Sequence, residues 1–290
     1  MANSLAALRA DIARMMGKLI TGTVTAGDVG FVTDMGGLAE YDEAGALRKT
    51  LLYIRTDAGL AGAAPEGESR MVIAYSGPGR TLTVYVAGPP ELGKQFSIAP
   101  AVGDIYEVYQ AFLDISAWNL AVNLAIRDAW PQVYAREIYD IAATGIDSYA
   151  LPATAEELLA VVVQQTGQRV GWPGYILPPA TYQVTGTPGT DLYCRLLNSP
   201  AADMRNLRFI YKARYPELAT NAATTDLDHE YITAAGVAYM YQQLAGLSGG
   251  RTDVGGYIQL MAHWQGVAAN RKAELAAGLL GTPMSGGKGK

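Results

Sequence analysis

Hydrophobic positions near the amino terminus recur at helical spacing. Over residues 4–20 the apolar side chains stand three or four residues apart, and Ser4 occupies a position that suits a helix N-cap. Arg9, Arg14 and Lys18 interrupt the apolar stripe and are expected to face water. The pattern predicts an amphipathic helix at the start of the fold.

The next stretch, residues 21–110, is rich in β-branched and aromatic residues separated by Gly and Pro, which is typical of short strands. The sequence SGPG at 76–79 has the composition of a turn and predicts a β-hairpin over 69–86. Strands are predicted at 51–55, 69–75, 81–86 and 103–109.

Residues 113–145 have an apolar pattern that predicts a helix, which Pro131 must kink or restart because proline has no N–H to donate. Thr154 and Glu157 have the spacing of a capping box, and the apolar run after them predicts a second helix to about residue 165.

Strand-like segments return over 171–215, where Pro178 and Pro179 must lie at a sheet edge or outside the ladder. Two helices are predicted after residue 226. The first contains Gly236 among alanines, which allows close packing within or between subunits. The second helix has its larger apolar residues on one face, namely Tyr257, Met261, Trp264, Ala268 and Leu275.

These elements predict an α+β fold with an N-terminal helix, small antiparallel sheet or barrel segments, and several packed helices, two of them near the carboxyl terminus. The predicted organisation is a helix plus β-rich domain, a helical segment, a β segment followed by two helices, and a flexible basic tail. The corresponding ranges are 1–112, 113–170, 171–280 and 281–290.

The overall charge argues against a protein that coats nucleic acid. The formal net charge is −5 and the isoelectric point is about 5.1, so the average surface repels phosphate. An acidic wall past which DNA slides remains compatible with these values. The first 20 residues have neither the basic cluster of a signal peptide nor a long apolar run, so a cytosolic product without a membrane span is expected.

Residue usage points to assembly more than to catalysis. The chain has 18 tyrosines but only 4 phenylalanines, and tyrosine suits half-buried surfaces and interfaces. Its abundant Gly and Ala fit a turn-rich assembly component, but a GC-rich genome would produce the same enrichment. The single cysteine, Cys194, excludes a disulfide within the chain and a cysteine cage for zinc, and its strand-like context predicts a core residue.

The stretch TTDLDHEYI, at 224–232, is the best candidate for chemistry. Asp226, Asp228, His229 and Glu230 offer metal ligands or an acid/base pair, but the same residue types favour a helix N-terminus, where they accept hydrogen bonds from free N–H groups. A metal site needs further ligands, and His263, the only other histidine, lies on a different predicted helix. Helix capping is the preferred interpretation, and no catalytic, metal or cofactor residue is predicted.

Sequence motifs add no reaction to this picture. The chain contains no G-x-G-x-x-G, P-loop, G-x-S-x-G, H-E-x-x-H or C-x-x-C pattern. The densest basic run, Arg205, Arg208, Lys212 and Arg214, places its last three members on one face of a strand. The run is either the polar side of an ordinary sheet or a contact with an acidic neighbouring subunit or DNA phosphate.

The order of the pieces resembles the neck, or head-to-tail connector (adaptor), proteins of tailed bacteriophages. The likeness spans about residues 4–247 and is one of pattern and order. It includes the opening helix and the β segment that ends with GDIYEVY, followed by later segments in the same order. Those later segments are NLAVNLAIRDA at 119–129, YALP at 149–152 before a helix, LRFIYKARYPEL at 207–218, and DLDHEYITAAGVAYMYQQL.

The resemblance implies a homo-oligomeric ring in the virion, with twelve subunits as the expected number. The ring would sit beneath the portal protein, contact tail or stopper proteins, and surround a channel for double-stranded DNA without reading its sequence. Neither cofactor nor membrane is implied, and assembly would follow synthesis in the host cytoplasm. Two alternatives stay open: a tail-tube, tail-completion or capsid-accessory protein, and a phage-associated hydrolase.

Overall fold

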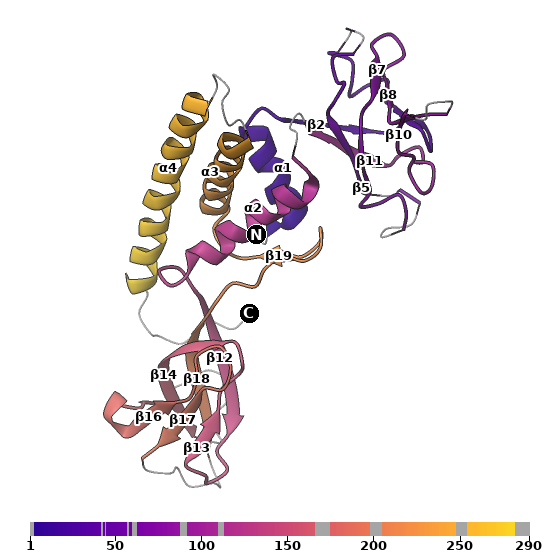
Figure 1. The fold of residues 1–290 in the computed structure, drawn as a ribbon. Helices are drawn as coiled ribbons and strands as arrows, with labels where there is room; N and C mark the ends of the chain where they lie inside the picture. Colours follow the sequence, from indigo (N-terminus) through magenta and orange to yellow (C-terminus); the bar gives the residue numbers. More distant parts are fainter. Residues whose placement is uncertain are drawn as a thin grey trace. The chain divides into compact units, whose positions relative to one another are not determined.

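The chain is described by a computed structural model, which covers residues 3–41, 43, 45–56, 58–59, 63–87, 92–109, 113–165, 175–197, 205–247 and 254–281. It is an α+β fold with four α-helices and several small antiparallel sheets, none of which closes into a barrel within these ranges (Figure 1). Two compact units are present. The first comprises Met1–Ala125 with Leu218–Ala268, and the second comprises Ile126–Glu217 with Ala269–Lys290.

The predicted N-terminal helix is present as α1 (Leu5–Met15), and Ser4 caps it by accepting a hydrogen bond from the Ala7 N–H at 3.2 Å. The helix stops earlier than its apolar pattern because Gly17 adopts a left-handed conformation, φ +63°, which commonly ends helices. Leu5, Leu8 and Ile12 are buried, as predicted, whereas Met15 at the end of the helix is 51% exposed.

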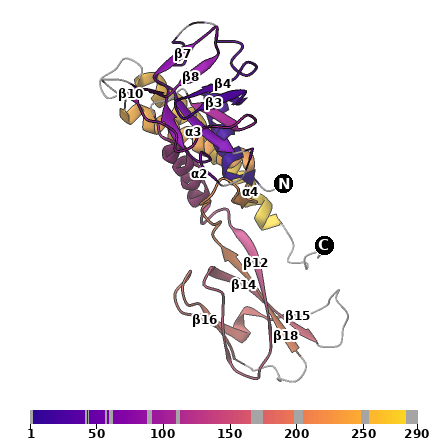
Figure 2. The same ribbon diagram turned by 90° about the vertical axis from the view of Figure 1, so that its right-hand side faces the viewer.

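Short strands form two four-stranded antiparallel sheets in the first unit, in the orders β2-β11-β5-β6 and β3-β4-β8-β7, the second of which is visible in Figure 2. Both contribute to one apolar core. The pairs β9-β10 and β1-β19 complete the set. The bounds are β1 (Asn3–Ser4), β2 (Leu19–Thr23), β3 (Ala26–Asp28), β4 (Phe31–Thr33), β5 (Leu51–Thr56), β6 (Ser69–Met71), β7 (Ala74–Ser76), β8 (Thr81–Thr83), β9 (Tyr85–Val86), β10 (Leu92–Gly93), β11 (Ile105–Tyr109) and β19 (Thr224–Thr225).

The predicted hairpin around 76–79 is confirmed, because β7 pairs with β8 across that turn. The predicted strand over 69–75 is divided, however. Its first part, β6, pairs with β5, and its second part, β7, belongs to the other sheet. The chain therefore passes from one sheet to the next in the middle of what the sequence presents as one strand.

Helices α2 (Ile115–Ala129), α3 (His229–Leu247) and α4 (Val254–Gly281) complete the α-helices. Helix α3 is buried on all sides from Tyr231 to Ala238, and it packs closely on α1. A Cβ on Gly236 would lie 2.3 Å from the Ile12 Cδ1 atom. The small residue in α3 therefore serves packing within the chain.

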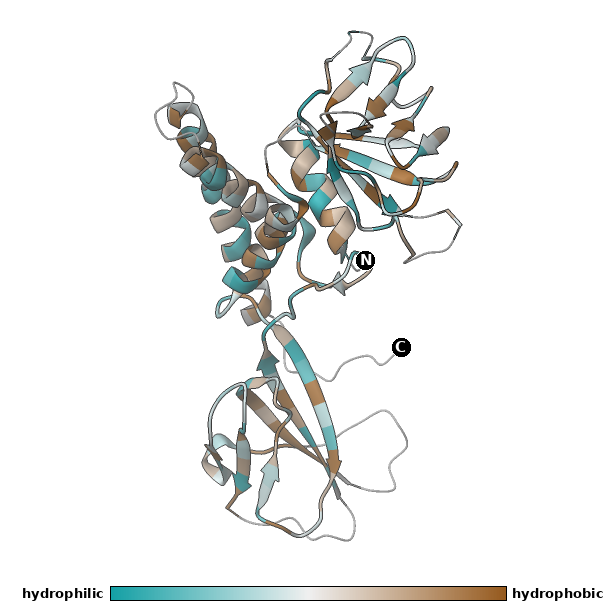
Figure 3. Ribbon diagram, turned by 45° about the vertical axis from the view of Figure 1, so that its right-hand side comes forward, coloured by the Kyte–Doolittle hydropathy of each residue, from teal (hydrophilic) through white to brown (hydrophobic). Residues whose placement is uncertain are grey.

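The second unit is built mainly of β-structure. Its sheets have the orders β12-β18-β14-β15 and β13-β17-β16, with an apolar core between them. Hydrophilic and hydrophobic residues alternate along β12 (Figure 3). The bounds are β12 (Ala135–Ala142), β13 (Ser148–Ala150), β14 (Ala155–Gln165), β15 (Tyr175–Ile176), β16 (Tyr182–Thr185), β17 (Tyr193–Leu196), β18 (Arg205–Ala213) and the 3₁₀-helix η1 (Pro179–Thr181).

The helical assignment of 113–170 is wrong beyond Ala129. Helix α2 ends just before Pro131, and the residues after it form strand β12 rather than a kinked or new helix. The capping-box interpretation of Thr154 and Glu157 is also wrong, since Thr154 lies in the turn before β14 and Glu157 lies within that strand. Glu157 in β14 accepts a hydrogen bond from Lys212 across the sheet at 2.6 Å. The β-branched run Val161–Val163 decides the outcome, because such residues favour the strand.

Two other sequence predictions concern loops and ends. Pro178 and Pro179 lie outside the ladder, as predicted: Pro178 precedes the 3₁₀-helix η1, and Pro179 is its first residue. The predicted flexible basic tail spans residues 281–290; Gly281 is the last residue of α4, and residues 282–290 lie outside the described residues.

Arg9 contradicts the prediction that it faces water. Its side chain is fully buried and pairs with the equally buried Glu107 carboxylate of β11, at 3.1 Å from Nη2 to Oε2. The Arg9 Nε atom donates to the Tyr109 hydroxyl at 2.8 Å, and Nη1 donates to the side-chain oxygens of Asn119 and Asn221 at 3.0 and 2.9 Å.

The remaining contacts of this cluster complete the pairing of its charges. The Tyr53 ring lies beneath the guanidinium at 4.7 Å, and Arg55 Nη1 lies 3.6 Å from Glu107 Oε1. Burial, followed by the Glu107 charge, raises the pKa of Tyr109. The Tyr109 hydroxyl therefore stays protonated and donates to Glu107 at 2.5 Å. The cluster joins α1 and α2 to the sheet and to the segment before α3.

Replacing Arg9 should therefore be among the most damaging single changes in the first unit. We expect Arg9→Met to lower the free energy of unfolding by about 3–5 kcal/mol, because it leaves the Glu107 carboxylate buried with only the more distant Arg55 as a cation. Urea denaturation followed by circular dichroism measures the change.

The matched control is Arg14→Met on the same helix, where the side chain is 53% exposed and pairs with Asp11. Exposed pairs of this kind contribute at most about 1 kcal/mol. Equal losses in the two variants would contradict the assignment of Arg9 as the central cation.

Candidate functional site

The acidic stretch before α3 forms a helix cap. Asp228 precedes the first helical residue, and its Oδ1 atom accepts a hydrogen bond from the Tyr231 N–H at 2.9 Å. Asp226 is exposed, and Glu230 lies in the first turn of the helix, where a negative charge complements the helix dipole. The capping interpretation is confirmed, with Asp228 as the capping residue.

His229 also has a partner within the chain. Its Nε2 atom lies 3.3 Å from Oδ2 of Asp11 in α1, and Asp11 in turn accepts a hydrogen bond from Arg14. Across the described ranges, no three His, Cys, Asp or Glu side chains are grouped so that they could hold a metal ion. His263 lies on α4, edge-on to the Trp264 ring at 5.5 Å.

Cys194 is a core residue, as its context predicts. It is fully buried in the second unit, and burial raises the pKa of its thiol to about 12. At neutral pH the group is therefore a protonated thiol, which is a poor nucleophile.

Arg205, Arg208 and Lys212 of the predicted basic run lie in β18, and Arg214 directly follows that strand. Arg208, Lys212 and Arg214 are separated by even numbers of residues and therefore share one face, as expected. Each is paired with a carboxylate of the same unit, so much of the positive charge is neutralised locally. Arg208 pairs with Asp140, Lys212 with Glu157, and Arg214 with Glu156, each at 2.6 Å. The side chain of Arg205 lies outside the described residues. Contact of the run with a neighbouring subunit or with DNA stays a prediction.

Aromatic rings support two of these cations. The Lys212 ammonium lies 4.8 Å from the centre of the Tyr134 ring, and the Arg214 guanidinium lies 5.3 Å from that of Trp130. The hydrogen bond to Asp140 raises the pKa of Arg208. These interactions hold the basic side chains along the sheet. They agree with the first of the two interpretations of the basic run, in which it forms the polar side of an ordinary sheet.

Asp34 is a buried carboxylate that sequence analysis did not single out. It accepts hydrogen bonds from the N–H groups of Thr23, Gly36 and Gly37 at 3.1, 2.8 and 2.9 Å, and from the Tyr106 hydroxyl at 2.8 Å. Burial opposes ionisation, but these four donors lower the pKa of Asp34 below its usual value of 3.8. With its acceptor sites occupied by the chain, Asp34 holds a loop in place.

Glycines make this loop possible. A Cβ on Gly22 would lie 2.2 Å from the Asp34 Oδ2 atom, and one on Gly37 would lie 2.4 Å from it. Only residues without a side chain allow the backbone to approach the carboxylate so closely.

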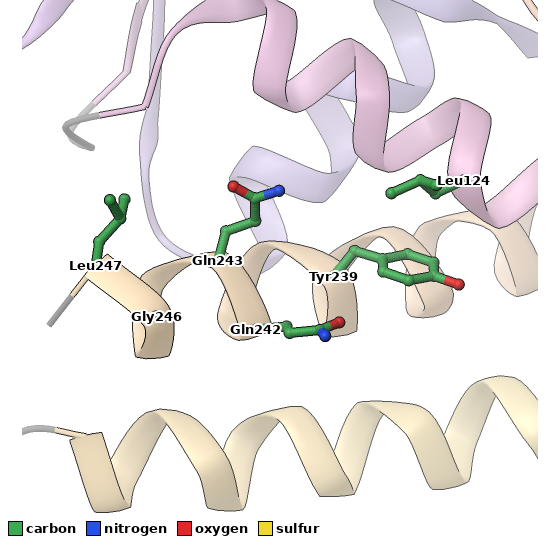
Figure 4. Close-up of a pocket in the computed structure, with 6 residues that line it drawn as sticks. All are labelled: Leu124, Tyr239, Gln242, Gln243, Gly246 and Leu247. Atoms are coloured by element: carbon green, nitrogen blue, oxygen red, sulfur yellow. The ribbon is translucent and has the colours of Figure 1, made fainter. Parts of the chain in front are cut away.

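A pocket of about 510 Å³ opens between α2 and α3. Figure 4 shows Tyr239 beside Leu124, and Gln243 and Leu247 pointing away from α4. None of the lining side chains is charged, so the pocket offers apolar contacts and amide or hydroxyl hydrogen bonds. The lining residues are Leu124, Tyr239, Gln242, Gln243, Gly246 and Leu247.

The outer surface of α4 is the second feature that sequence analysis missed. The predicted face is turned inward: Tyr257 stacks on Tyr241 of α3 at 6.1 Å, and Ala268 is buried. Away from that face, Ile258, Leu260 and Val267 are 48%, 41% and 38% exposed. Residues 254–270 contain no Asp, Glu, Lys or Arg. This run without charge is the signal that could have identified the surface.

No protein-family model matches the chain, and no curated protein sequence is significantly similar to it. Within the part of the chain that the structure describes, no helix has both the length and the apolar character needed to cross a membrane.

The capping assignment gives a direct prediction. Asp228→Ala should lower the free energy of unfolding by about 1 kcal/mol, because the Tyr231 N–H loses its acceptor at the helix N-terminus. The matched control is Asp226→Ala, at an exposed position where a change of at most about 0.5 kcal/mol is expected. Chemical denaturation compares the variants, and a loss confined to Asp226→Ala would contradict the assignment.

The Asp34 hydrogen bonds predict a dependence on pH. Because the folded pKa of Asp34 is lowered, the carboxylate stabilises the fold above its unfolded pKa of about 4, and this contribution is lost as pH falls through the lower folded pKa. Asp34→Asn should destabilise the protein by about 2 kcal/mol at neutral pH.

Urea denaturation of the wild type and of Asp34→Asn, at pH 7 and again near pH 3, measures this effect. The difference between the two proteins should narrow below about pH 4, where the carboxyl of the unfolded wild-type chain takes up a proton while the folded one stays ionised. A difference that stayed constant over this range would show that packing, and not the charge, is responsible.

Proposed function

We propose that the chain is a structural protein of a tailed-bacteriophage virion that forms a multimeric ring at the head-to-tail junction. In this role each subunit is part of a wall between the portal protein and the tail or stopper proteins. Double-stranded DNA passes through the ring without sequence-specific contacts.

The order of elements supports the proposal. Helix α1, strand β11, helix α2, strand β18 and the capped helix α3 occur where the resemblance to neck proteins expects them. The segment after YALP departs from the pattern, because it is strand β14 instead of a helix. This departure lies in the second unit and puts the likeness of that unit in doubt.

The observation that carries the proposal is the uncharged apolar surface of α4. A helix of 28 residues that packs on α3 through one face and leaves Ile258, Leu260 and Val267 exposed has apolar surface on more than one side. Exposed apolar side chains on a helix that already packs through another face mark contact sites between proteins. An assembly covers such a surface, whereas a monomer leaves it in water.

Other structural roles within a virion would also require this surface of α4 to be covered by a neighbouring protein. A tail-tube, tail-completion or capsid-accessory protein also buries subunit faces, so location distinguishes it from a neck protein. The hydrolase alternative drew its support from the acidic stretch at 226–230. Capping by Asp228 and the position of Glu230 in the first helical turn account for two of these carboxylates.

The experiment is to measure the mass of the purified full-length chain by multi-angle light scattering, alone and with the portal ring encoded in the same genome. We expect a multimer in solution or a fixed number of chains on each portal ring. The result that would contradict the proposal is a protein that stays monomeric and does not associate with the portal.

Mass spectrometry of separated heads and tails then tests the location. A neck protein is expected with the head fraction after portal assembly, in an amount that matches the portal. Recovery with tails alone, or in capsid-like abundance, would favour the tail or capsid-accessory role instead.

A further inference from the structure

We propose that the outer face of α4 in one copy packs into the α2–α3 pocket of a second copy, in a head-to-tail contact. This inference rests on the proposed ring-forming function and names the two surfaces that make the ring. Both surfaces belong to the first unit, so each subunit presents one of each.

The convex surface is the outer side of α4 within Val254–Ala268. At 100° per residue, Gly255, Ala262 and Gly266 lie along one stripe. Ile258 and Gln265 border this stripe on one side, and Gln259 and His263 border it on the other. Leu260 and Val267 lie further round, toward the side that packs on α3. A surface with a shallow centre and exposed side chains without Asp, Glu, Lys or Arg around it fits against another helix.

The glycines of this stripe have no purpose within the chain. Glycine is among the least favourable residues in a helix interior, and nothing lies within 4 Å of a Cβ placed on Gly255 or Gly266. Gly236 in α3 is the opposite case, because Ile12 occupies the space that its Cβ would need. The close approach of a neighbouring subunit would explain why position 266 is a glycine, just as the contact with Ile12 explains Gly236 within the chain.

The concave surface is the pocket between α2 and α3. Apolar side chains extend it at both ends: Leu120, one helical turn from Leu124, is 48% exposed, and Leu247 is 65% exposed. Gly246 in its lining also has open space where a Cβ would lie. The absence of charge among the lining residues matches the uncharged run of α4, and charged residues are depleted in the same way at the centres of protein interfaces.

The two surfaces lie on opposite sides of α3. Tyr241 faces α4, while Gln243 and Gly246 lie about 200° and 140° away around the helix. In Figure 4, Gln243 and Leu247 point away from the α4 ribbon. A subunit with complementary surfaces on opposite sides associates head to tail, and such contacts close into rings when the rotation between neighbours allows it.

Dimensions fit a helix-sized contact. The uncharged run of α4 is about 25 Å long, and the 19 residues of α3 extend about 28 Å. At a helix diameter of about 10 Å, this contact covers about 250 Å² on each partner, below the roughly 800 Å² of a standard interface. A single contact is therefore weak, and association should depend strongly on concentration.

The test uses one variant of each surface in the full-length chain. Gly266→Leu adds bulk to the convex face, and Gly246→Leu fills the pocket. Both positions face open space within the chain, and leucine favours a helix, so both variants should fold and melt at or above the temperature of the dilute wild type. The control is Ala277→Leu, on the exposed side of α4 beyond the uncharged run.

Sedimentation across a concentration series gives the expected pattern. The wild type and Ala277→Leu should rise well above the monomer mass of 30.8 kDa, and each glycine variant alone should stay at that mass. An equimolar mixture of the two glycine variants should form a dimer of about twice the mass, because each pair retains one intact α4 face and one intact pocket.

Each other outcome decides against the inference. If Gly246→Leu assembles normally while Gly266→Leu does not, α4 contacts a surface other than the pocket. If Gly266→Leu assembles normally, or if Ala277→Leu fails to assemble, the assembly surface is not the uncharged face of α4. A wild type that stays monomeric in solution but decorates the portal ring overturns this contact and leaves the proposed function standing; failure to do either removes the proposed function itself.

Discussion

The buried pair of Arg9 and Glu107 is the interaction on which the first unit depends. A guanidinium removed from water is tolerated only when its charge and its N–H groups are satisfied, and Arg9 meets this requirement through partners from α2, β11 and the segment before α3. These partners must all be in place together, because the loss of any one leaves a buried polar group unpaired. The pair thus fixes where α1 lies against the sheet, and α3 packs on α1 through the close contact at Gly236. The two uncharged surfaces described above are both carried by helices that this arrangement positions.

Local patterns predicted the local features well. Ser4 caps α1, an aspartate caps α3, and Cys194 is buried, because each of these outcomes depends on neighbours in the chain or on a simple apolar context. Arg9 could not be placed in this way. Its position lies one turn from buried Leu5 and next to Leu8, which should have raised doubt, but its partners are 98, 100, 110 and 212 residues away in the sequence. Only the fold brings an acid, a tyrosine and two asparagines to one guanidinium.

The errors in the second unit have a different cause. In β14 the sequence combines a capping-box spacing with an apolar run, and each is compatible with a helix when considered alone. The strand contains two register shifts against β18, which disturb the two-residue alternation that would have revealed it. Residues 160 and 162 are also buried on the side away from the main core, so the apolar run appears continuous. The hydrogen bonds between β14 and the full length of β18 outweigh the weak helical preference of the β14 sequence. No local pattern in β14 indicates that it pairs with β18.

Contacts within one chain do not explain the residues on the exposed face of α4. Periodicity correctly placed Tyr257 toward α3 and Ala268 in a buried position, because a helix must bury one face and the larger side chains gather there. The same reasoning assigns the opposite face to water and predicts charged residues on it, yet none occurs between Val254 and Asn270. Helical glycines that meet no neighbour point the same way, since a chain optimised as a monomer would gain helix stability from alanine at those positions. A surface that lacks Asp, Glu, Lys and Arg, exposes Ile258, Leu260 and Val267 and is not covered by its own chain is best explained by a second polypeptide. The neutral pocket on the other side of α3 makes another copy of the same chain a sufficient partner.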